Sequence, residues 1–400
     1  MVKKILFITW DGPQTFYMEG LFMPIFKEVM KYCDVEFHVM QFTWGKNERT
    51  KITADIAKNL NIHYTSVSIL RRPIVALGSI YTLLNGSKKI QKYIDRHKID
   101  IVMPRSTFPA FMVNNINISK VQVIFDADGL PIEEKVEFEG LKKNGFVYNF
   151  MKSIEKKILY NSDVVITRSY KAIDILINEF GDKLKNKFTV VNNGRNINDF
   201  KYTLSYRESI RKKYSIPENS ILLIYVGSLG EKYALKEMNE IFERVKMLKE
   251  AYFLILTGDE QYVNKIIPNY SDKQVIVIKA NSADVPKYIC AADIGFALIY
   301  PTHSMKAAVP TKLGEYLLCG LPVIASANIG DTEYILKDFK NCFIYDHNEN
   351  FKKQLFEIAD FIVKHKDKDK DREKTRSIAI EHFSLETSAK MYYSAIKKVL

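Results

Sequence analysis

The feature that most constrains the fold is a repeated alternation between short apolar runs and longer segments of helical period. The runs are rich in β-branched residues and lack polar alternation, as is typical of strands covered on both faces. In the first half they occupy residues 4–10, 35–42, 99–104, 121–128, 162–169 and 188–193. In the second half they occupy residues 221–227, 252–258, 274–280, 293–300 and 321–326. This alternation predicts an α/β fold built on doubly wound parallel sheets.

Two such sets of strands in 400 residues predict two domains, each large enough for its own core. A polar stretch separates the two sets, so we expect an N-terminal domain over residues 1–195 and a C-terminal domain over residues 196–383. Ser384 can cap a last helix over residues 384–400, because apolar residues recur there at helical spacing.

The net charge of +12 favours an anionic partner such as a phosphate ligand, a nucleic acid or an anionic membrane surface. Nucleic acid is disfavoured, because the lysines are spread along the chain and no recognition motif appears. The 4 cysteines are widely spaced, so they indicate neither a disulfide framework nor a CxxC metal site.

Ligands of open α/β sheets bind outside the carboxyl ends of the strands, so the residues that follow each strand are the candidates for a site. Asp11, Gly12 and Pro13 follow the first strand, and we expect a helix to open near Thr15. Exposed amides there suit a phosphate or a sugar oxygen. The pattern GxGxxG is absent, which argues against dinucleotide binding, and a simple tight turn is the alternative interpretation.

The first strand of the second half is followed by "GSLGEK", in which Gly227 and Gly230 allow close backbone approach. Lys232 would then face an anion at the start of the next helix. A surface lysine in a glycine-rich turn is the alternative interpretation. Main-chain groups around Asn281, which follows a later strand, would suit the edge of a nucleotide base.

The segment "PTKLGEYLLCGLPVIAS" (310–326) predicts a helix that begins near Thr311 and ends at Gly320, just ahead of a strand. Lys312 and Glu315 are three residues apart and share one face of this helix. An exposed ion pair worth under about 1 kcal/mol is the simplest interpretation. The helix start, the lysine and a carboxylate able to accept from a vicinal diol together predict a nucleotide-sugar site.

Four segments in this order resemble the retaining glycosyltransferases of the GT-B fold, the group 1 or family 4 class. They are "NNGRNINDF" (192–200), "YVGSLGEK" (225–232), "AADIGFALIYP" (291–301) and the segment at 310–326. The first half is similar more loosely, through residues 103–110, 123–129 and 161–169. The resemblance implies two Rossmann-like domains that face each other across a cleft, with the final helix crossing back to the first domain.

The resemblance also implies a nucleoside-diphosphate sugar as donor on the second domain and an acceptor on the first. Glu315 matches the glutamate that holds the ribose, and Lys232 matches the basic residue that faces the diphosphate. Gly12 lies in the loop that faces the donor from the other domain, and Asp128 would position the acceptor or cap its own turn. The expected catalytic residues are Lys232, Glu315 and Asp128. The expected donor-binding residues are Gly12, Gly227, Ser228, Asn281, Thr311 and Lys312.

The sequence departs from the family pattern at two positions. Ala307 stands where many members carry a second glutamate, and Ser228 stands where an arginine often follows the glycine. Neutralisation of the diphosphate would therefore depend on Lys232 and Lys312. No acidic pair has metal-ligand spacing at a strand end, so we expect no metal, no cofactor and metal-independent transfer.

We therefore expect a hexosyl transferase that retains the anomeric configuration and extends a glycan or a lipid-linked acceptor in surface polysaccharide or glycoconjugate synthesis. A sugar-nucleotide epimerase or hydrolase on the same fold is one alternative, and rapid conversion of donor alone would identify it. A non-catalytic partner subunit is another alternative, motivated by Ala307 and Ser228, and failure to bind any nucleoside diphosphate would identify it.

Residues 69–93 place basic residues on both sides of an apolar stretch, as interfacial segments do. A core helix with a basic outer face is the simpler interpretation. The N-terminus, "MVKKILFITWDGP", is typical of a first strand and not of a signal peptide. We expect a cytoplasmic protein, with peripheral contact to an anionic membrane at its cytoplasmic face as a further hypothesis.

Overall fold

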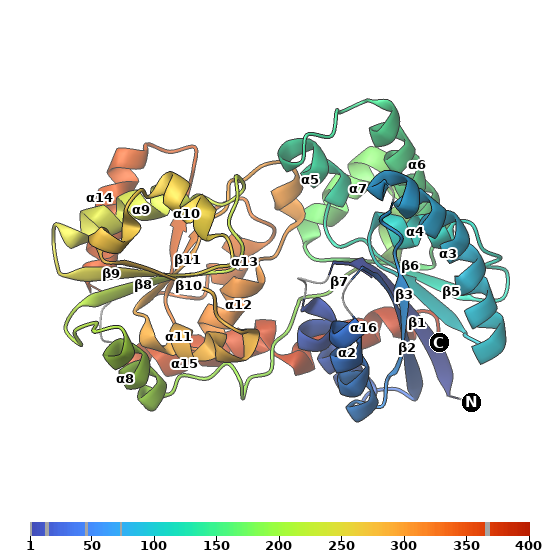
Figure 1. Ribbon diagram of the computed structural model, residues 1–400, viewed down its shortest axis with the longest axis horizontal. Coiled ribbons are helices and arrows are strands. Elements are labelled where there is room, and N and C mark those ends of the chain that lie inside the picture. The colour runs from blue at the N-terminus through green and yellow to red at the C-terminus, as the bar shows by residue number, and fades with distance from the viewer. Residues whose placement is uncertain (1, 13–15, 45–46, 73, 365–368) are drawn as a thin grey trace. The chain divides into compact units, whose positions relative to one another are not determined.

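The chain forms two units, each with its own parallel sheet, in a computed structural model that describes residues 2–12, 16–44, 47–72, 74–364 and 369–400 (Figure 1). The N-terminal unit comprises residues 1–193 together with 385–400, and the C-terminal unit comprises residues 194–384. The sequence analysis placed these boundaries between residues 195 and 196 and between residues 383 and 384.

Seven strands of the described chain form the N-terminal sheet, in the order β3-β2-β1-β4-β5-β6-β7, and every pairing is parallel. The strands are β1 (Lys3–Asp11), β2 (Val35–Thr43), β3 (His63–Ser68), β4 (Ile101–Pro104), β5 (Gln122–Asp126), β6 (Val164–Thr167) and β7 (Phe188–Val190). The helices are η1 (Met18–Phe22), α1 (Met23–Val29), α2 (Asn47–Asn59), α3 (Val75–His97), α4 (Thr107–Val113), α5 (Pro131–Phe138), α6 (Phe146–Asn161), α7 (Tyr170–Phe180) and η2 (Asp182–Lys187).

The last helix, α16 (Leu385–Lys397), belongs to the N-terminal unit although it follows the whole C-terminal unit in sequence. It packs beside α1, and Tyr392 and Ile396 are fully buried in the core that α1 forms with the sheet. Tyr392 meets Phe26 edge to face, with ring centroids 6.0 Å apart. Apolar burial therefore joins this helix to the first half of the chain.

Six strands of the described chain form the C-terminal sheet, also parallel, in the order β10-β9-β8-β11-β12-β13. The strands are β8 (Ile221–Val226), β9 (Ala251–Leu256), β10 (Val275–Ile278), β11 (Ile294–Ala297), β12 (Val323–Ser326) and β13 (Phe343–Tyr345). The helices are α8 (Leu204–Lys213), α9 (Leu235–Lys246), α10 (Glu260–Ile266), η3 (Tyr270–Lys273), η4 (Ser282–Asp284), α11 (Val285–Ala291), η5 (Ser304–Ala307), α12 (Thr311–Leu318), α13 (Thr332–Leu336), α14 (Phe351–Lys364) and α15 (Asp369–Phe383).

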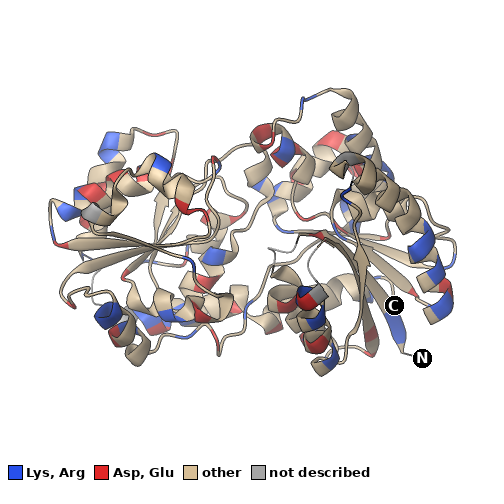
Figure 2. Ribbon diagram, viewed as in Figure 1, with Lys and Arg blue, Asp and Glu red and all other residues tan. Residues whose placement is uncertain are grey.

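Both sheets have the strand order of a dinucleotide-binding fold, in which the chain reverses direction across the sheet next to the first strand. Every residue of β8 is buried, as the continuous apolar run in its sequence predicts for a central strand. In Figure 2 the strands are almost entirely tan, and the charged residues lie on helices and loops. The expected α/β fold with two doubly wound parallel sheets is confirmed.

Among the helices in the described part of the chain, none combines the length and the apolar character that crossing a bilayer requires.

Candidate functional site

The order of the C-terminal sheet places a candidate site at the carboxyl ends of β8 and β11. These two strands are neighbours, and the connections that leave them run to opposite sides of the sheet, which is where open α/β sheets bind ligands. Gly227 follows β8 directly, and Lys312 lies in the first turn of α12, between β11 and β12. The topology thus brings together two of the residues that the sequence analysis selected.

Gly227 has φ 125°, a backbone conformation that residues with a side chain rarely adopt. A Cβ atom built at this position would lie 3.4 Å from Nζ of Lys312. The absence of a side chain therefore keeps the space beside the lysine ammonium open. Close backbone approach to a bound anion is the usual reason for a glycine in such a place.

Lys312 is 7% exposed, and its ammonium is the unusual feature of this site. Nζ lies 3.9 Å from the ring centroid of Tyr225 and 4.5 Å from that of Tyr233. Within the described residues, Nζ has no hydrogen-bond partner. Burial lowers the pKa of Lys312 to about 7, an effect that Glu315 opposes and Lys232 reinforces. A buried ammonium held only by two aromatic rings is matched to an anion that the protein itself does not supply.

The rings around Lys312 are fixed by hydrogen bonds to the turn after β8. The hydroxyl of Tyr225 donates to the carbonyl of Ser228 over 2.6 Å, and the hydroxyls of Ser228 and Tyr233 lie 3.4 Å apart. Ser228 therefore holds the two tyrosine rings in place, a role that the sequence analysis did not predict for it.

Lys232 adds a second positive charge near Lys312. Its Nζ lies 5.4 Å from the ring centroid of Tyr233, and its charge contributes to the lowered pKa of Lys312. The carbonyl of Lys232 accepts from the backbone N–H of Tyr300 over 3.0 Å, which ties the turn to the chain after β11. We call Tyr225, Lys232, Tyr233 and Lys312 the lysine–tyrosine cluster.

Glu315, one turn further along α12, is 9% exposed and pairs with an arginine that the sequence analysis did not select. Nε of Arg195 donates to Oε1 of Glu315 over 2.8 Å. Arg195 is held in turn by its backbone N–H, which donates to the carbonyl of Phe383 over 2.8 Å. Lys312 and Glu315 therefore do not form the exposed ion pair that was the simplest interpretation: both are buried, and the carboxylate is fixed by Arg195.

The helix that carries these residues begins and ends where the sequence predicts. α12 spans Thr311–Leu318, with Pro310 at the N-cap position, and Gly320 follows it with φ 68°. Gly314 allows close packing below the helix, because a Cβ there would lie 2.8 Å from the ring of Phe383. This packing fixes the position from which Lys312 and Glu315 project.

Asn281, a predicted donor-binding residue, lies apart from the lysine–tyrosine cluster. Ala307, a departure from the family pattern, contributes no charge to the cluster. Asn281 is exposed and lies beyond the end of β10, an edge strand two positions from β8. Ala307, where a second glutamate is common in the family, is fully buried at the end of η5. Of the residues that the sequence analysis selected at this end of the sheet, Lys232 and Lys312 therefore carry the main charge.

In the N-terminal unit, Gly12 follows β1, and a Cβ there would lie 2.7 Å from the indole ring of Trp44. Close packing against this ring therefore requires glycine, whatever the turn binds. Pro13, expected in the turn, and Thr15, near which a helix was expected to open, lie outside the described residues.

Asp128 follows β5 and forms an ion pair with Arg105, with its side chain 37% exposed. The same arginine donates to the buried Asp126 over 2.9 Å, and Arg168 donates to Asp126 over 2.5 Å. Burial alone would raise the pKa of Asp126, but Arg168 and Arg105 outweigh it and hold this pKa below its usual value. The hydroxyl of Tyr392 lies 3.5 Å from the same carboxylate oxygen.

We call Arg105, Asp126, Arg168 and Tyr392 the arginine–aspartate network. The sequence analysis missed it, although a signal was present: Arg105, Asp126 and Arg168 each stand at or directly after the end of a parallel strand. Carboxyl ends of neighbouring strands meet at one edge of a sheet, so opposite charges there are expected to pair.

The strand order of both sheets, with the lysine–tyrosine cluster in the C-terminal unit, is that of the GT-B class of fold. Solved structures share it along the whole chain. Anabaena HepE in complex with UDP-glucose matches with a TM-score of 0.71 and 14% identity, covering 98% of this chain and 99% of that one. A glycosyltransferase from Rickettsia africae matches with a TM-score of 0.69 and 16% identity, covering 100% and 98%. WaaG, a glycosyltransferase of lipopolysaccharide biosynthesis, matches with a TM-score of 0.65 and 15% identity, covering 98% of each chain.

A family model matches the sequence of the C-terminal unit. Residues 206–381 match the family model described as glycosyl transferases group 1, a segment that holds the lysine–tyrosine cluster and all of α12. The C-terminal unit is therefore similar in sequence to the glycosyl transferases of group 1. No curated protein matches its sequence.

Proposed function

We propose that this protein is a retaining glycosyltransferase of the family 4 class that uses a nucleoside-diphosphate sugar, with the donor held by the lysine–tyrosine cluster. The observation that carries the proposal is the buried ammonium of Lys312, which has no hydrogen-bond partner within the described residues. A diphosphate supplies the missing negative charge at the carboxyl end of β8. HepE, which has the same fold, is known in complex with UDP and with UDP-glucose.

The roles of the residues follow from the chemistry of the leaving group. As the glycosidic bond breaks, negative charge develops on the diphosphate, and preorganised positive charge lowers the barrier. Lys312 and Lys232 supply this charge beside Gly227, where the backbone can approach the phosphates closely. We therefore propose that transfer proceeds without a metal ion, and that full activity in excess EDTA is the expected result.

Glu315 acts in this proposal as a binding residue for the ribose. A carboxylate offers about four lone-pair positions, so Glu315 can accept from a vicinal diol while it holds the guanidinium of Arg195. Arg195 fixes the orientation of the carboxylate before the donor binds, and this lowers the entropy lost on binding.

The test is turnover of a panel of UDP- and GDP-sugars with the Glu315→Gln variant, with the anomeric configuration of the product read by NMR. Loss of one charge-assisted hydrogen bond predicts a fall of about 10- to 100-fold in kcat/KM. Glu349→Gln, an exposed glutamate of the same unit, is the matched control and should retain wild-type turnover. Wild-type turnover by Glu315→Gln would refute the site, and an inverted product would refute retention.

Incubation of the donor without acceptor distinguishes transfer from the alternative chemistries of this fold. Slow hydrolysis of the donor alone, with rapid consumption of the donor only when acceptor is added, supports the transferase. Rapid epimerisation or rapid hydrolysis of the donor alone would identify the protein as an epimerase or a hydrolase.

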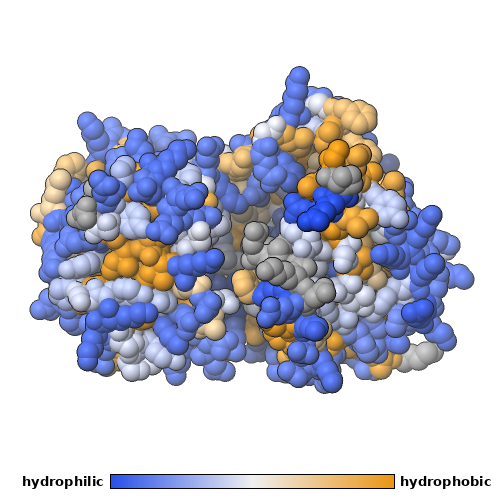
Figure 3. All heavy atoms as spheres, in the orientation of Figure 1, coloured by the Kyte–Doolittle hydropathy of each residue, from blue (hydrophilic) through white to orange (hydrophobic). Residues whose placement is uncertain are grey.

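An outward apolar face on α3 supports a lipid-linked acceptor and contact with a membrane. Leu77, Ile80, Tyr81 and Leu84 are each more than half exposed and recur at intervals of three and four residues, so they share one face of the helix. Figure 3 shows apolar surface over this part of the N-terminal unit. The simpler interpretation of this stretch, a core helix with a basic outer face, does not describe this face.

The inward face of α3 explains why its large apolar residues point outward. A Cβ at Gly78 would lie 2.3 Å from the carbonyl oxygen of Leu70, and one at Gly86 would lie 2.2 Å from the sulfur of Met112. Thr82, between them, is buried and donates to the carbonyl of Gly78 over 2.8 Å. Small residues thus let the helix lie close to the protein while its leucines remain on the surface.

A second apolar group lies at the start of α6, where Phe146 is 87% exposed and Phe150 is 48% exposed. Both α3 and α6 contact α4. Exposed basic residues flank the two groups, at Arg71, Arg72, Lys88, Lys89, Lys142 and Lys143. We propose that this face binds an anionic bilayer, since apolar anchors with basic flanks are typical of interfacial helices.

Flotation with vesicles that contain phosphatidylglycerol tests the membrane proposal. The double variant Leu77→Gln and Leu84→Gln should bind at least about tenfold more weakly, because each leucine gains roughly 1.5–3 kcal/mol on burial. Leu248→Gln, a half-exposed leucine of the C-terminal unit, is the control and should float like the wild type. Equal flotation of all three proteins would refute the proposed surface.

A further inference from the structure

Two histidines and a glutamate converge on the sheet of the N-terminal unit, and the proposed transfer reaction makes no use of them. Glu36 and His38 lie on β2, and His63 lies on the edge strand β3. Their ligand-type atoms all lie within 4.8 Å of one another. The lysine–tyrosine cluster and Glu315 belong to the other unit.

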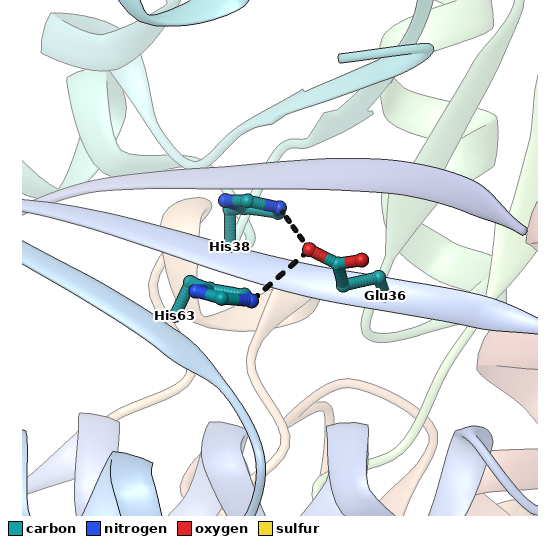
Figure 4. Close-up of side chains that lie close together, drawn as sticks. All are labelled: Glu36, His38 and His63. Carbon is teal, nitrogen blue, oxygen red and sulfur yellow. Dashed lines mark hydrogen bonds and ion pairs between the residues drawn. The ribbon is translucent and has the colours of Figure 1, made fainter. Parts of the chain in front are cut away.

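The sheet register explains why these three side chains meet. His38 and His63 are direct partners in the parallel ladder, and Glu36 precedes His38 by two residues on the same face of β2. Figure 4 shows the two imidazole rings stacked, each with its Nε2 directed at one oxygen of Glu36. Oε1 of Glu36 lies 2.8 Å from Nε2 of His38 and 3.0 Å from Nε2 of His63.

The hydrogen bonds define what each ring contributes. An ionised carboxylate only accepts, so both Nε2 atoms carry a proton that points at the same oxygen. Nδ1 of His38 lies 2.9 Å from the hydroxyl of Tyr93, which belongs to α3. His38 is 1% exposed, so its ring is held in one orientation by these two contacts.

We propose that Glu36, His38 and His63 form a binding site for one divalent cation of the zinc class. Two imidazole nitrogens and a carboxylate oxygen are the donor set that Zn²⁺ prefers, whereas Mg²⁺ and Ca²⁺ require oxygen ligands throughout. Ligands about 2.0–2.1 Å from a tetrahedral Zn²⁺ lie roughly 3.3 Å apart. The observed separations of 2.8 and 3.0 Å to Oε1 therefore require a small outward movement of the carboxylate.

The second partner of His38 fits this assignment. Metal-binding histidines usually use their other ring nitrogen in a hydrogen bond that fixes the tautomer and the orientation of the ring. When Nε2 of His38 binds the cation, the ring proton moves to Nδ1 and donates to the hydroxyl of Tyr93. This exchange of tautomers moves one proton from Nε2 to Nδ1 of the same ring and releases none to solvent.

The cation would fasten the edge strand β3 to β2. Only Val67 of the six residues of β3 is buried, so apolar packing holds this strand weakly. His63 is 59% exposed at its side chain, which leaves the fourth coordination position open to water. The site is therefore accessible from solution and does not depend on the proposed sugar transfer.

Isothermal titration of the tag-free, metal-stripped full chain with ZnCl₂ tests the site. The expected result is one equivalent of Zn²⁺ bound per chain in the micromolar range or tighter, with a visible absorption band when Co²⁺ replaces it. His63→Ala should weaken binding by more than about 100-fold, and Tyr93→Phe, which keeps all three ligands, by about 10-fold or more. Zn²⁺ should also raise the unfolding temperature of the wild type and leave that of His63→Ala unchanged.

His303→Ala is the matched control, because it removes an exposed histidine from the C-terminal unit and should bind Zn²⁺ like the wild type. Glu36→Gln provides a second test of the ligand set with a nearly isosteric side chain. Wild-type affinity in His63→Ala and Glu36→Gln, or no micromolar binding by the wild type, would overturn the proposal. Neither outcome bears on the donor site, which is tested with Glu315.

Discussion

Both sheets bury charged side chains at the carboxyl ends of their strands, but the two units treat these charges differently. In the N-terminal unit, the carboxylate of Asp126 accepts from Arg105 and from Arg168. Among the atoms of these side chains, Nε of Arg168 has no hydrogen-bond partner within the described residues. In the C-terminal unit, the ammonium of Lys312 is buried with no hydrogen-bond acceptor in the same part of the chain. In the first arrangement the protein supplies the opposite charge itself, and in the second we propose that a bound anion supplies it.

The difference shows how a structural charge can be told from a functional one. Burying a charge without a partner costs several kcal/mol, so a fold retains one only where something else compensates. A network that satisfies itself indicates a role in stability. A buried cation that faces two aromatic rings and a glycine indicates a binding site, at a cost to the stability of the empty protein.

The largest expected loss of stability is in the arginine–aspartate network. Asp126→Asn leaves the buried Arg168 without a counter-charge and Arg105 with Asp128 alone, and it should lower the free energy of unfolding of the N-terminal unit by about 3–5 kcal/mol. The 2 tryptophans of the chain, Trp10 and Trp44, both lie in this unit, so fluorescence during urea unfolding reports on it alone. Asp174→Asn, an exposed aspartate of the same unit, should unfold like the wild type. A urea midpoint of Asp126→Asn equal to that of the wild type would contradict the proposed contrast between the two units.

The Lys312→Met variant should show the opposite balance, with more stability and less function. Loss of one preorganised positive charge predicts a fall of about 10²–10³ in kcat. Removal of a buried charge should raise the unfolding free energy near pH 6 by on the order of 5 kcal/mol, because the pKa falls from 10.5 to about 7 and each pKa unit corresponds to about 1.4 kcal/mol. Donor turnover and chemical unfolding followed by circular dichroism measure the two effects.

Lys249→Met, an exposed lysine of the same unit, is the control for this variant and should change neither quantity. A Lys312→Met protein that is both less active and less stable would contradict the proposed role of the ammonium. It would mean that Lys312 supports the fold.

The pH dependence of donor binding should sharpen the same comparison. The pKa of Lys312 is about 7 in the empty protein, and a bound diphosphate will raise it. Above pH 7 the lysine must therefore take up a proton when it binds the donor, and affinity should fall by up to about tenfold per pH unit. Calorimetry at pH 8 in two buffers of different ionisation enthalpy measures this uptake, which should be close to one proton and absent in Lys312→Met.

The same shift fixes the sign of the pH effect on stability. The pKa of Lys312 is 10.5 in the absence of burial and about 7 in the fold, so the unfolded chain binds more protons between these values. This group therefore makes stability rise as pH increases through that window and has no further effect above it.

The smallest expected effect is at the edge of the arginine–aspartate network. Asp128 is 37% exposed and shares Arg105 with Asp126, so Asp128→Asn should lower the unfolding free energy by less than about 1 kcal/mol. If Asp128 positions the acceptor, the variant will raise KM for the acceptor and leave donor binding unchanged. Initial rates at varied acceptor concentration measure this, and a change in donor affinity alone would exclude that role.

The sequence predicts the central strands of the described chain but only two of the four edge strands, β7 and β10. β8 is a continuous apolar run, because helices cover both faces of a central parallel strand. β3 ("HYTSVS") and β13 ("FIY") were not predicted, since an edge strand needs less apolar burial and β13 has only three residues. Pairing with a neighbouring strand, and not local sequence pattern, makes these segments strands.

The candidate site was predictable to a similar extent. Gly227, Lys312 and Glu315 could be selected because they follow strands or open a helix in a motif that resembles a known family. Arg195 could not, because its role depends on a contact with Glu315, 120 residues away in the sequence. The sequence analysis could not decide between an interfacial segment and a core helix for α3, and it took the core helix as the simpler interpretation. Only the packing of Gly78 and Gly86 decides which side of that helix meets the protein.

The position of α16 has a consequence for how the chain is made. The ribosome delivers residues 1–193 first, but four buried side chains of that core, Ala389, Tyr392, Ala395 and Ile396, arrive only after the entire second unit. Until then, the groove beside α1 is not covered by α16, and Asp126 lacks its hydroxyl partner. During synthesis the second unit can therefore reach its native state before the first, and a fragment that stops at residue 384 will expose an apolar groove that invites aggregation.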